Sequence, residues 1–127
     1  RHFMNRTNLV PYVLEKYQQG QRHFQNLDME NESFDEQNLE GIIFEDCSLY
    51  ISFRKTNLRN TTFINGGIKT CDFRDSDLTN ARFENVCIEG AQFARSKTDN
   101  IYFDNNSTFG QLVTKSHFDD WIKDYEE

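Results

Sequence analysis

A large apolar residue recurs at every fifth position over most of this sequence. Phenylalanine occupies alternate positions of the ladder, and leucine or isoleucine occupies most of the positions between them. The ladder consists of Phe34, Leu39, Phe44, Leu49, Phe53, Leu58, Phe63, Ile68, Phe73, Leu78, Phe83, Ile88, Phe93 and Phe103. A second register, two positions before each ladder residue, holds small or aliphatic side chains such as Cys71, Ser76 and Ala81.

This period fits neither of the common secondary structures. An α-helix repeats its faces about every 3.6 residues and a strand about every 2, so neither buries one residue in five. A square coil with sides of five residues does, because the ladder residue and the small residue before it point inward while the other three turn the corner. We therefore predict an all-β fold, a parallel β-helix of about four coils over residues 32–110.

The predicted corners carry asparagine at regular intervals. Asparagine recurs twenty positions apart in two series, Asn60, Asn80, Asn100 and Asn65, Asn85, Asn105. Asparagine tolerates turns and left-handed backbone angles, and stacked asparagines can form hydrogen-bonded ladders. We expect both series to lie at corners, one coil above the other.

The repeat units resemble those of a known family. Residues 71–85, read as Cys-Asp-Phe-Arg-Asp, Ser-Asp-Leu-Thr-Asn and Ala-Arg-Phe-Glu-Asn, and residues 91–95, Ala-Gln-Phe-Ala-Arg, are similar to the five-residue units of pentapeptide repeat proteins. The resemblance covers residues 32–110 and implies a right-handed quadrilateral β-helix. The sequence departs from the pattern in four places: the four-residue step between Leu49 and Phe53, the Gly66-Gly67 pair, Thr98 and Thr108.

Residues 1–31 are predicted to cap the first coil. Residues 8–19 read as a short amphipathic helix with Asn8 as its N-cap and Gly20 as its stop. Residues 21–33 look like degraded repeats, with Phe24 and Met29 in register with the ladder. An open end of a β-helix would expose its core and its unpaired strand edge, so a cap is expected there.

Residues 111–127 are predicted to contain a second helix. It spans residues 116–125, with Ser116 as N-cap, and its apolar stripe consists of Phe118, Trp121, Ile122 and Tyr125. The stripe has two interpretations. It either folds back over the last coil as a cap, which the weak core positions Thr98 and Thr108 favour, or forms a dimer seam. We therefore expect a monomer, or a homodimer joined through this helix.

Charge and cysteine usage restrict the partners. The formal net charge is −7, and because phosphate groups are bound by clustered Lys and Arg, neither nucleic acid nor an anionic membrane is an expected partner. No apolar run of about twenty residues is present to span a bilayer.

The three cysteines lack metal-ligand spacing, which favours reduced thiols and a cytoplasmic protein. Cys47 and Cys71 are predicted to point inward and Cys87 outward.

The sequence contains no recognisable catalytic motif. His2, His23 and His117 lie outside the repeats, and none has a Cys or His neighbour at metal-ligand spacing. There is no Gly-x-Ser-x-Gly elbow, and Gly66-Gly67 lacks the lysine of a phosphate-binding loop. A rod filled with side chains also leaves no pocket. We expect a non-enzyme without cofactor or metal.

The remaining candidate is the outer surface. One wall is predicted to be acidic and consists of Glu45, Asp46, Glu84 and Asp104, and the opposite wall displays Arg54, Lys55, Arg74 and Arg95 among carboxylates. The leading hypothesis is a non-catalytic scaffold or binding module for another protein, with the acidic wall as the contact. The alternative comes from the resemblance, since some pentapeptide repeat proteins are acidic rods that mimic DNA and modulate the type II topoisomerase gyrase.

Overall fold

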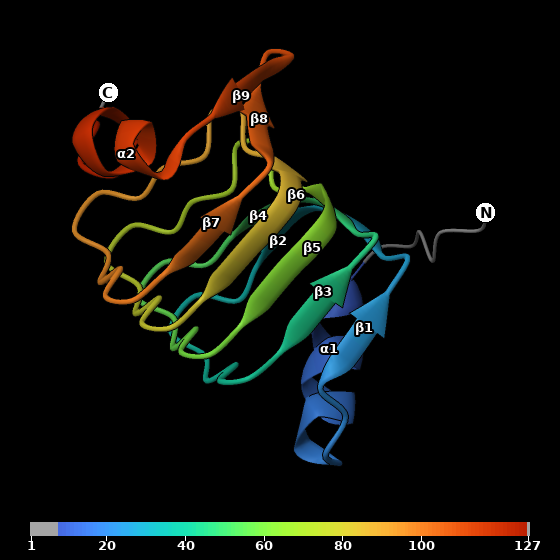
Figure 1. The fold of residues 1–127 in the computed structure, drawn as a ribbon. Coiled ribbons are helices and arrows are strands. Elements are labelled where there is room, and N and C mark those ends of the chain that lie inside the picture. Colours follow the sequence, from blue (N-terminus) through green and yellow to red (C-terminus); the bar gives the residue numbers. More distant parts are fainter. Residues whose placement is uncertain (1–7, 127) are drawn as a thin grey trace.

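The chain forms a four-sided parallel β-helix of about four turns with a short helix near each end (Figure 1). The structure is a computed structural model that describes residues 8–126; His2 lies outside this range. The elements are α1 (Leu9–Gln18), β1 (His23–Gln25), β2 (Asp28–Ser33), β3 (Ile43–Glu45), β4 (Ser48–Ser52), β5 (Thr62–Gly67), β6 (Arg82–Cys87), β7 (Tyr102–Asp104), β8 (Asn106–Thr108), β9 (Gln111–Val113), α2 (Lys115–His117) and the π-helix η1 (Phe118–Ile122). The predicted fold class is confirmed.

Parallel pairing between successive turns sets the register. Along one wall, β1, β3, β5, β6 and β7 pair in order, and each phenylalanine lies opposite the phenylalanine of the next turn. On the adjoining wall β2 pairs with β4, which brings Met29 opposite Leu49. Phe24 and Met29 belong to the degraded repeats, and both are buried. The pairing of β1 with β3 and of β2 with β4 therefore places residues 23–33 within the stacked turns.

Two stacks of phenylalanine rings fill the axis. In one stack the centroids of Phe53 and Phe73 are 5.1 Å apart with an interplanar angle of 2°. In the other, Phe63 and Phe83 are 5.1 Å apart at 6°. The stacks meet edge to face, as between Phe63 and Phe73 at 5.6 Å and 84°. All of the predicted ladder residues are buried.

The second register is small because the rings leave little room, and its polar members are satisfied internally. The hydroxyl of Thr56 donates to the Phe34 carbonyl at 3.0 Å, and that of Ser76 donates to the Phe73 carbonyl at 2.6 Å. Cys47 and Cys71 are buried, whereas Cys87 is partly exposed. Burial raises the pKa of Cys47 to about 11 and that of Cys71 to about 12.

The corners adopt left-handed backbone angles, as the asparagine spacing predicts. The six corner asparagines of the two series have φ between 54° and 61°. Their side chains form ladders: Asn105 donates to Asn85 at 3.1 Å, Asn85 donates to Asn65 at 3.0 Å, and Asn100 donates to Asn80 at 2.8 Å. These amide contacts link one turn to the next along the outside of the rod.

Helix α1 covers the first turn, but its cap differs from the prediction. Asn8 occupies the N-cap position, yet its side chain makes no capping hydrogen bond. The Glu32 carboxylate accepts instead from the N–H groups of Leu9 at 3.1 Å and Val10 at 2.9 Å. Leu9 and Val13 are fully buried in the core. A long-range carboxylate therefore replaces the local cap, because β2 presents it to the helix N-terminus.

The C-terminal helix begins earlier than predicted and is irregular. Thr114, not Ser116, is the N-cap, since its Oγ1 accepts from the N–H of His117 at 3.0 Å. The residues of the predicted apolar stripe differ in burial. Phe118 is fully buried, with its ring 4.7 Å from that of Phe103 and 5.0 Å from that of Phe93, and Ile122 packs partly against the core. Phe118 thus caps the last turn, while Trp121 and Tyr125 remain exposed.

Gly66 accommodates the four-residue step in the ladder. The turn between Leu49 and Phe53 is one residue short, so Ser48 pairs with Gly67 and Gly66 lies against Cys47 of the preceding turn. A Cβ on Gly66 would stand 2.2 Å from the carbonyl oxygen of Cys47, whereas a Cβ on Gly67 would meet nothing closer than 3.9 Å. The first of the two glycines is therefore required sterically.

We expect Gly66→Ala to destabilise the protein by at least about 2 kcal/mol, because a methyl group would collide with backbone that cannot move aside. Gly67→Ala is the matched control and is expected to change stability by less than about 0.5 kcal/mol. Chemical denaturation of both variants provides the measurement. Equal unfolding midpoints would contradict the assigned register between these turns.

Candidate protein-interaction surface

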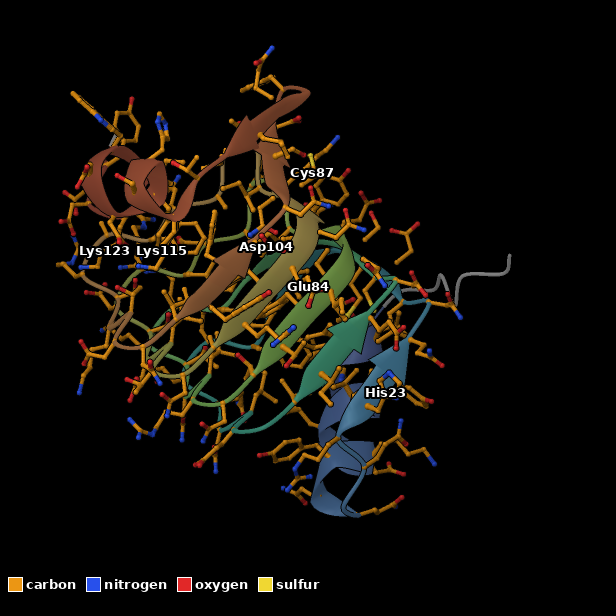
Figure 2. The ribbon with its side chains drawn as sticks, in the orientation of Figure 1. His23, Glu84, Cys87, Asp104, Lys115 and Lys123 are labelled. Atoms are coloured by element: carbon orange, nitrogen blue, oxygen red, sulfur yellow. The ribbon has the colours of Figure 1, made fainter. Side chains whose placement is uncertain are left out.

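Three carboxylates of the predicted acidic wall lie in one column. The parallel register places Glu45 opposite Ile64, Ile64 opposite Glu84, and Glu84 opposite Asp104. Figure 2 shows Glu84 and Asp104 on the neighbouring strands β6 and β7. Asp46 stands beside the column, at a corner with φ of 56°. The structure therefore brings the predicted residues to one wall, with Ile64 interrupting the negative charge.

The carboxylates of the column differ in how far they are neutralised. Glu45 contacts the His23 ring nitrogen at 2.7 Å, and Glu84 pairs with Arg82 at 2.6 Å. For Asp104, the interactions within residues 8–126 include no ion pair. The column therefore ends at the last turn in a carboxylate that makes no direct ion pair within the described chain. Its charge still acts on Arg82, whose pKa is raised first by the hydrogen bond to Glu84 and further by nearby negative charge that includes Asp104.

The opposite wall is not a free basic surface, because its arginines are paired with carboxylates. Arg74 contacts Asp72 at 2.7 Å, and Arg54 and Arg95 both contact Asp75, at 3.3 Å and 2.7 Å. Hydrogen bonds from Arg95 lower the pKa of Asp75. Burial raises the pKa of Asp72, but hydrogen bonds from Arg74 outweigh it and the net shift is downward. This wall is a network of compensated charges that links successive turns.

A groove lies over the last turn where the acidic wall meets the C-terminal segment. Its volume is about 660 Å³. It is lined by Asn65, Glu84, Asn85, Phe103, Asp104, Asn105, Leu112, Val113, Thr114 and Lys115. One side is thus carboxylate and amide, and the other consists of Leu112 and Val113 of β9 followed by Thr114 and Lys115. The sequence pattern identified Glu84 and Asp104 but not the groove, because the groove depends on where β9 folds.

Exposed apolar side chains gather at the same end of the rod. Phe109 is 80% exposed, Leu112 73%, Trp121 71% and Tyr125 60%. Phe109 and Leu112 lie in the β8–β9 hairpin, which the five-residue period could not predict. Trp121 and Tyr125 line a smaller hollow of about 180 Å³ with Ile88 and Ala91. Large exposed apolar groups of this kind are typical of contact surfaces.

The two histidines of residues 8–126 are widely separated. His23 is on β1 and His117 is at the end of α2, at opposite ends of the rod (Figures 1 and 2). Residues 8–126 contain no cluster of three or more His, Cys, Asp or Glu side chains arranged to hold a metal ion. No helix within the same residues is long and apolar enough to cross a bilayer.

Comparison with known proteins identifies the repeat. A family model described as "Pentapeptide repeat region" matches residues 20–93. A solved structure of QnrB1, a plasmid-mediated fluoroquinolone resistance protein, is 22% identical over 66% of this chain and 44% of that chain, with a TM-score of 0.52. This similarity concerns the fold alone. No curated protein matches the sequence.

More distant structural matches carry the same repeat. HetL, a pentapeptide repeat protein involved in heterocyst differentiation regulation in the cyanobacterium Nostoc sp. strain PCC 7120, is 19% identical over 70% of this chain and 40% of that chain, with a TM-score of 0.38. Rfr23 from Cyanothece 51142 is 10% identical over 84% and 99%, with a TM-score of 0.27. The chain thus spans less than half the length of the QnrB1 and HetL structures.

We expect Asp75→Asn to remove part of the acid sensitivity of the fold. The pKa of Asp75 is lower in the folded than in the unfolded state, so its ion pairs stabilise the protein above about pH 4, and this contribution is lost as the pH falls through the folded value. The unfolding temperature of the variant should lie a few degrees below wild type at neutral pH and converge with it near about pH 2.

Thermal unfolding followed by circular dichroism across this range measures the difference. Asp99→Asn, which changes an exposed carboxylate on the last turn with no side-chain ion pair in the described residues, is the control and should track wild type. A constant gap between Asp75→Asn and wild type at every pH would contradict the assigned network.

Proposed function

The chain belongs to the pentapeptide repeat family, and we propose that it is a non-catalytic module that binds another protein through its acidic wall and the groove at its last turn. The observation that carries the proposal is the column of carboxylates that runs into this groove. Its final member, Asp104, has no compensating ion pair in the described residues, and apolar side chains stand exposed beside it. A charged and apolar surface of this kind suits a protein partner.

The packing of the axis supports a binding role over a catalytic one. Phenylalanine rings fill the interior at contact distance, and the hollow beneath Gly66 and Gly67 has a volume of only about 10 Å³. Recognition must then use the outer surface. The net charge of −7 favours a protein partner over nucleic acid or an anionic membrane. Three free cysteines are in keeping with a cytoplasmic protein.

A homodimer through the C-terminal helix is an alternative use of the same end. Phe118 is committed to the core, so only Trp121 and Tyr125 of the predicted stripe are available to a second copy. The proposal therefore takes the monomer as the binding unit. Sedimentation of the purified protein distinguishes the two states.

DNA mimicry directed at gyrase is the second candidate function. The aligned column of carboxylates favours it, as does membership of the pentapeptide repeat family, some of whose members are acidic rods that mimic DNA. Ile64 interrupts the column, and Glu84 is already paired with Arg82. The acidic face is consequently short, which favours the protein-binding module over a DNA-like footprint.

One set of variants tests both candidates. The wall variant carries Glu45→Gln, Asp46→Asn, Glu84→Gln and Asp104→Asn, and the control variant removes four exposed carboxylates elsewhere: Glu15→Gln, Glu30→Gln, Glu36→Gln and Asp99→Asn. Each immobilised protein is used to capture partners from the native cell extract. We expect wild type and the control to retain a partner that the wall variant loses by about tenfold or more. Equal retention by the wall variant would refute the proposed surface.

The same proteins are then added to a gyrase supercoiling assay. The binding-module proposal predicts no change in gyrase activity or quinolone sensitivity, even with the protein in large excess. Inhibition or protection at comparable concentrations of the two proteins, lost in the wall variant and kept in the control, would establish the DNA-mimic function instead.

A further inference from the structure

The strand β7 is paired along one edge only, and its outer edge is open at the end of the rod (Figure 1). β6 is six residues long, and the next turn covers it with β7 and β8. β9 then folds back antiparallel along β8, from Asn106 opposite Val113 to Thr108 opposite Gln111. In the described part of the chain, no strand lies along the outer edge of β7. The last turn is thus closed over β8 and open over β7.

The open edge presents the backbone of Phe103. The N–H of Tyr102 donates to the Ala81 carbonyl at 2.9 Å, so the polar backbone groups of Tyr102 and Asp104 face β6. Successive residues of a strand direct their backbone groups to opposite sides, so the N–H and carbonyl groups of Phe103 point away from β6. Its ring is nevertheless covered by Phe118 at 4.7 Å. The core is therefore sealed while the strand edge is not, and such an edge is a template for one further strand.

The groove of about 660 Å³ lies directly at this edge. Phe103, Asp104 and Asn105 line it on one side, and Val113 and Thr114 line it on the other. Three residues of extended chain span about 10 Å, which matches the length of β7 that is left uncovered. An added strand would lie in line with β9, and its side chains could pack against the exposed Leu112.

The charges of the groove select the sequence of that strand. Asp104 supplies a carboxylate without an ion pair in the described residues, and Glu84 supplies a second one that is shared with Arg82 at 2.6 Å. The ammonium of Lys115 is engaged by Asp119 at 2.5 Å. The amide of Asn105 donates to Asn85 at 3.1 Å, which leaves its carbonyl oxygen without a donor among the described residues. The groove therefore offers acceptors and negative charge, and it complements a basic side chain.

We propose that the open edge of β7 binds an extended lysine- or arginine-bearing segment of the partner protein as an added β-strand. This deepens the proposed protein-binding function and rests on it. Backbone hydrogen bonds to Phe103 give the segment its register, and Asp104 with Glu84 selects its basic residues. A second copy of this chain is disfavoured as the occupant, because it would bring a second set of the same carboxylates to the groove.

Labelled peptides test the added strand directly. The first peptide has about seven residues of alternating lysine and valine, long enough to cover β7 with some overhang. The second replaces lysine by glutamate, and the third is the basic peptide with alternate backbone amides N-methylated. Fluorescence anisotropy should show binding of the basic peptide, and binding at least about tenfold weaker for the other two. Amide exchange at Phe103 should slow when the basic peptide binds.

Two protein variants separate the groove from general electrostatic attraction. Asp104→Asn should weaken binding of the basic peptide by about tenfold, since it removes the unpaired carboxylate at the edge. Asp99→Asn removes one exposed carboxylate from another side of the same turn and should bind as wild type does. Equal weakening by both variants would overturn the assignment of the site.

Other outcomes also overturn the added strand. Equal binding of the N-methylated peptide would show that the backbone edge is not used, as would unchanged exchange at Phe103. Failure of the basic peptide to bind would do the same. A protein that sediments as a dimer and already protects the Phe103 amide would assign the edge to a second copy. The proposed function fails separately, only if capture from the extract is insensitive to the wall variant.

Discussion

Face-to-face contact between phenylalanine rings one turn apart is the interaction on which the structure depends. The ring centroids of Phe53, Phe73 and Phe93 follow one another at 5.1 Å, close to the spacing of about 4.8 Å between neighbouring strands. Ring stacking and backbone pairing therefore agree on the same rise per turn. Edge-to-face contact between the two stacks adds about 0.5 to 1.5 kcal/mol per pair beyond burial. A core of this kind tolerates only small residues in the second register.

This core decides where function can lie. The ladder and the second register fill the inward positions with core side chains, so recognition has to use the outer surface. There the parallel register aligns side chains of the same kind in columns. On one wall alignment gives ion pairs from Arg54 and Arg95 to Asp75, which link successive turns. On the other it gives the column that ends in Asp104. The end of the rod differs from its sides, since Phe118 seals the rings but leaves the strand edge of β7 open.

The five-residue period could predict every feature that repeats. It gave the stacks, the inward and outward sides, the left-handed corner asparagines and the alignment of Glu84 with Asp104. It could not predict contacts made once. Glu32 caps α1 through the tertiary fold, and Thr114 caps α2 because β9 ends there. Asn106, at the start of β8, is polar at a second-register position. Its side-chain oxygen accepts a hydrogen bond from the N–H of Val86, and its amide nitrogen donates one to the Phe83 carbonyl. The β8–β9 hairpin and the groove lie where the five-residue period ends.

The stability of Phe73→Ala tests the central role of the ring stacks most directly. Phe73 is fully buried and lies 5.1 Å from both Phe53 and Phe93. Removing its ring opens a cavity between two stacked neighbours, and denaturant unfolding should show a loss of about 3 to 5 kcal/mol. Lys97→Ala, at an exposed position, should cost less than about 0.5 kcal/mol. Unfolding midpoints that are equal for the two variants would contradict the account.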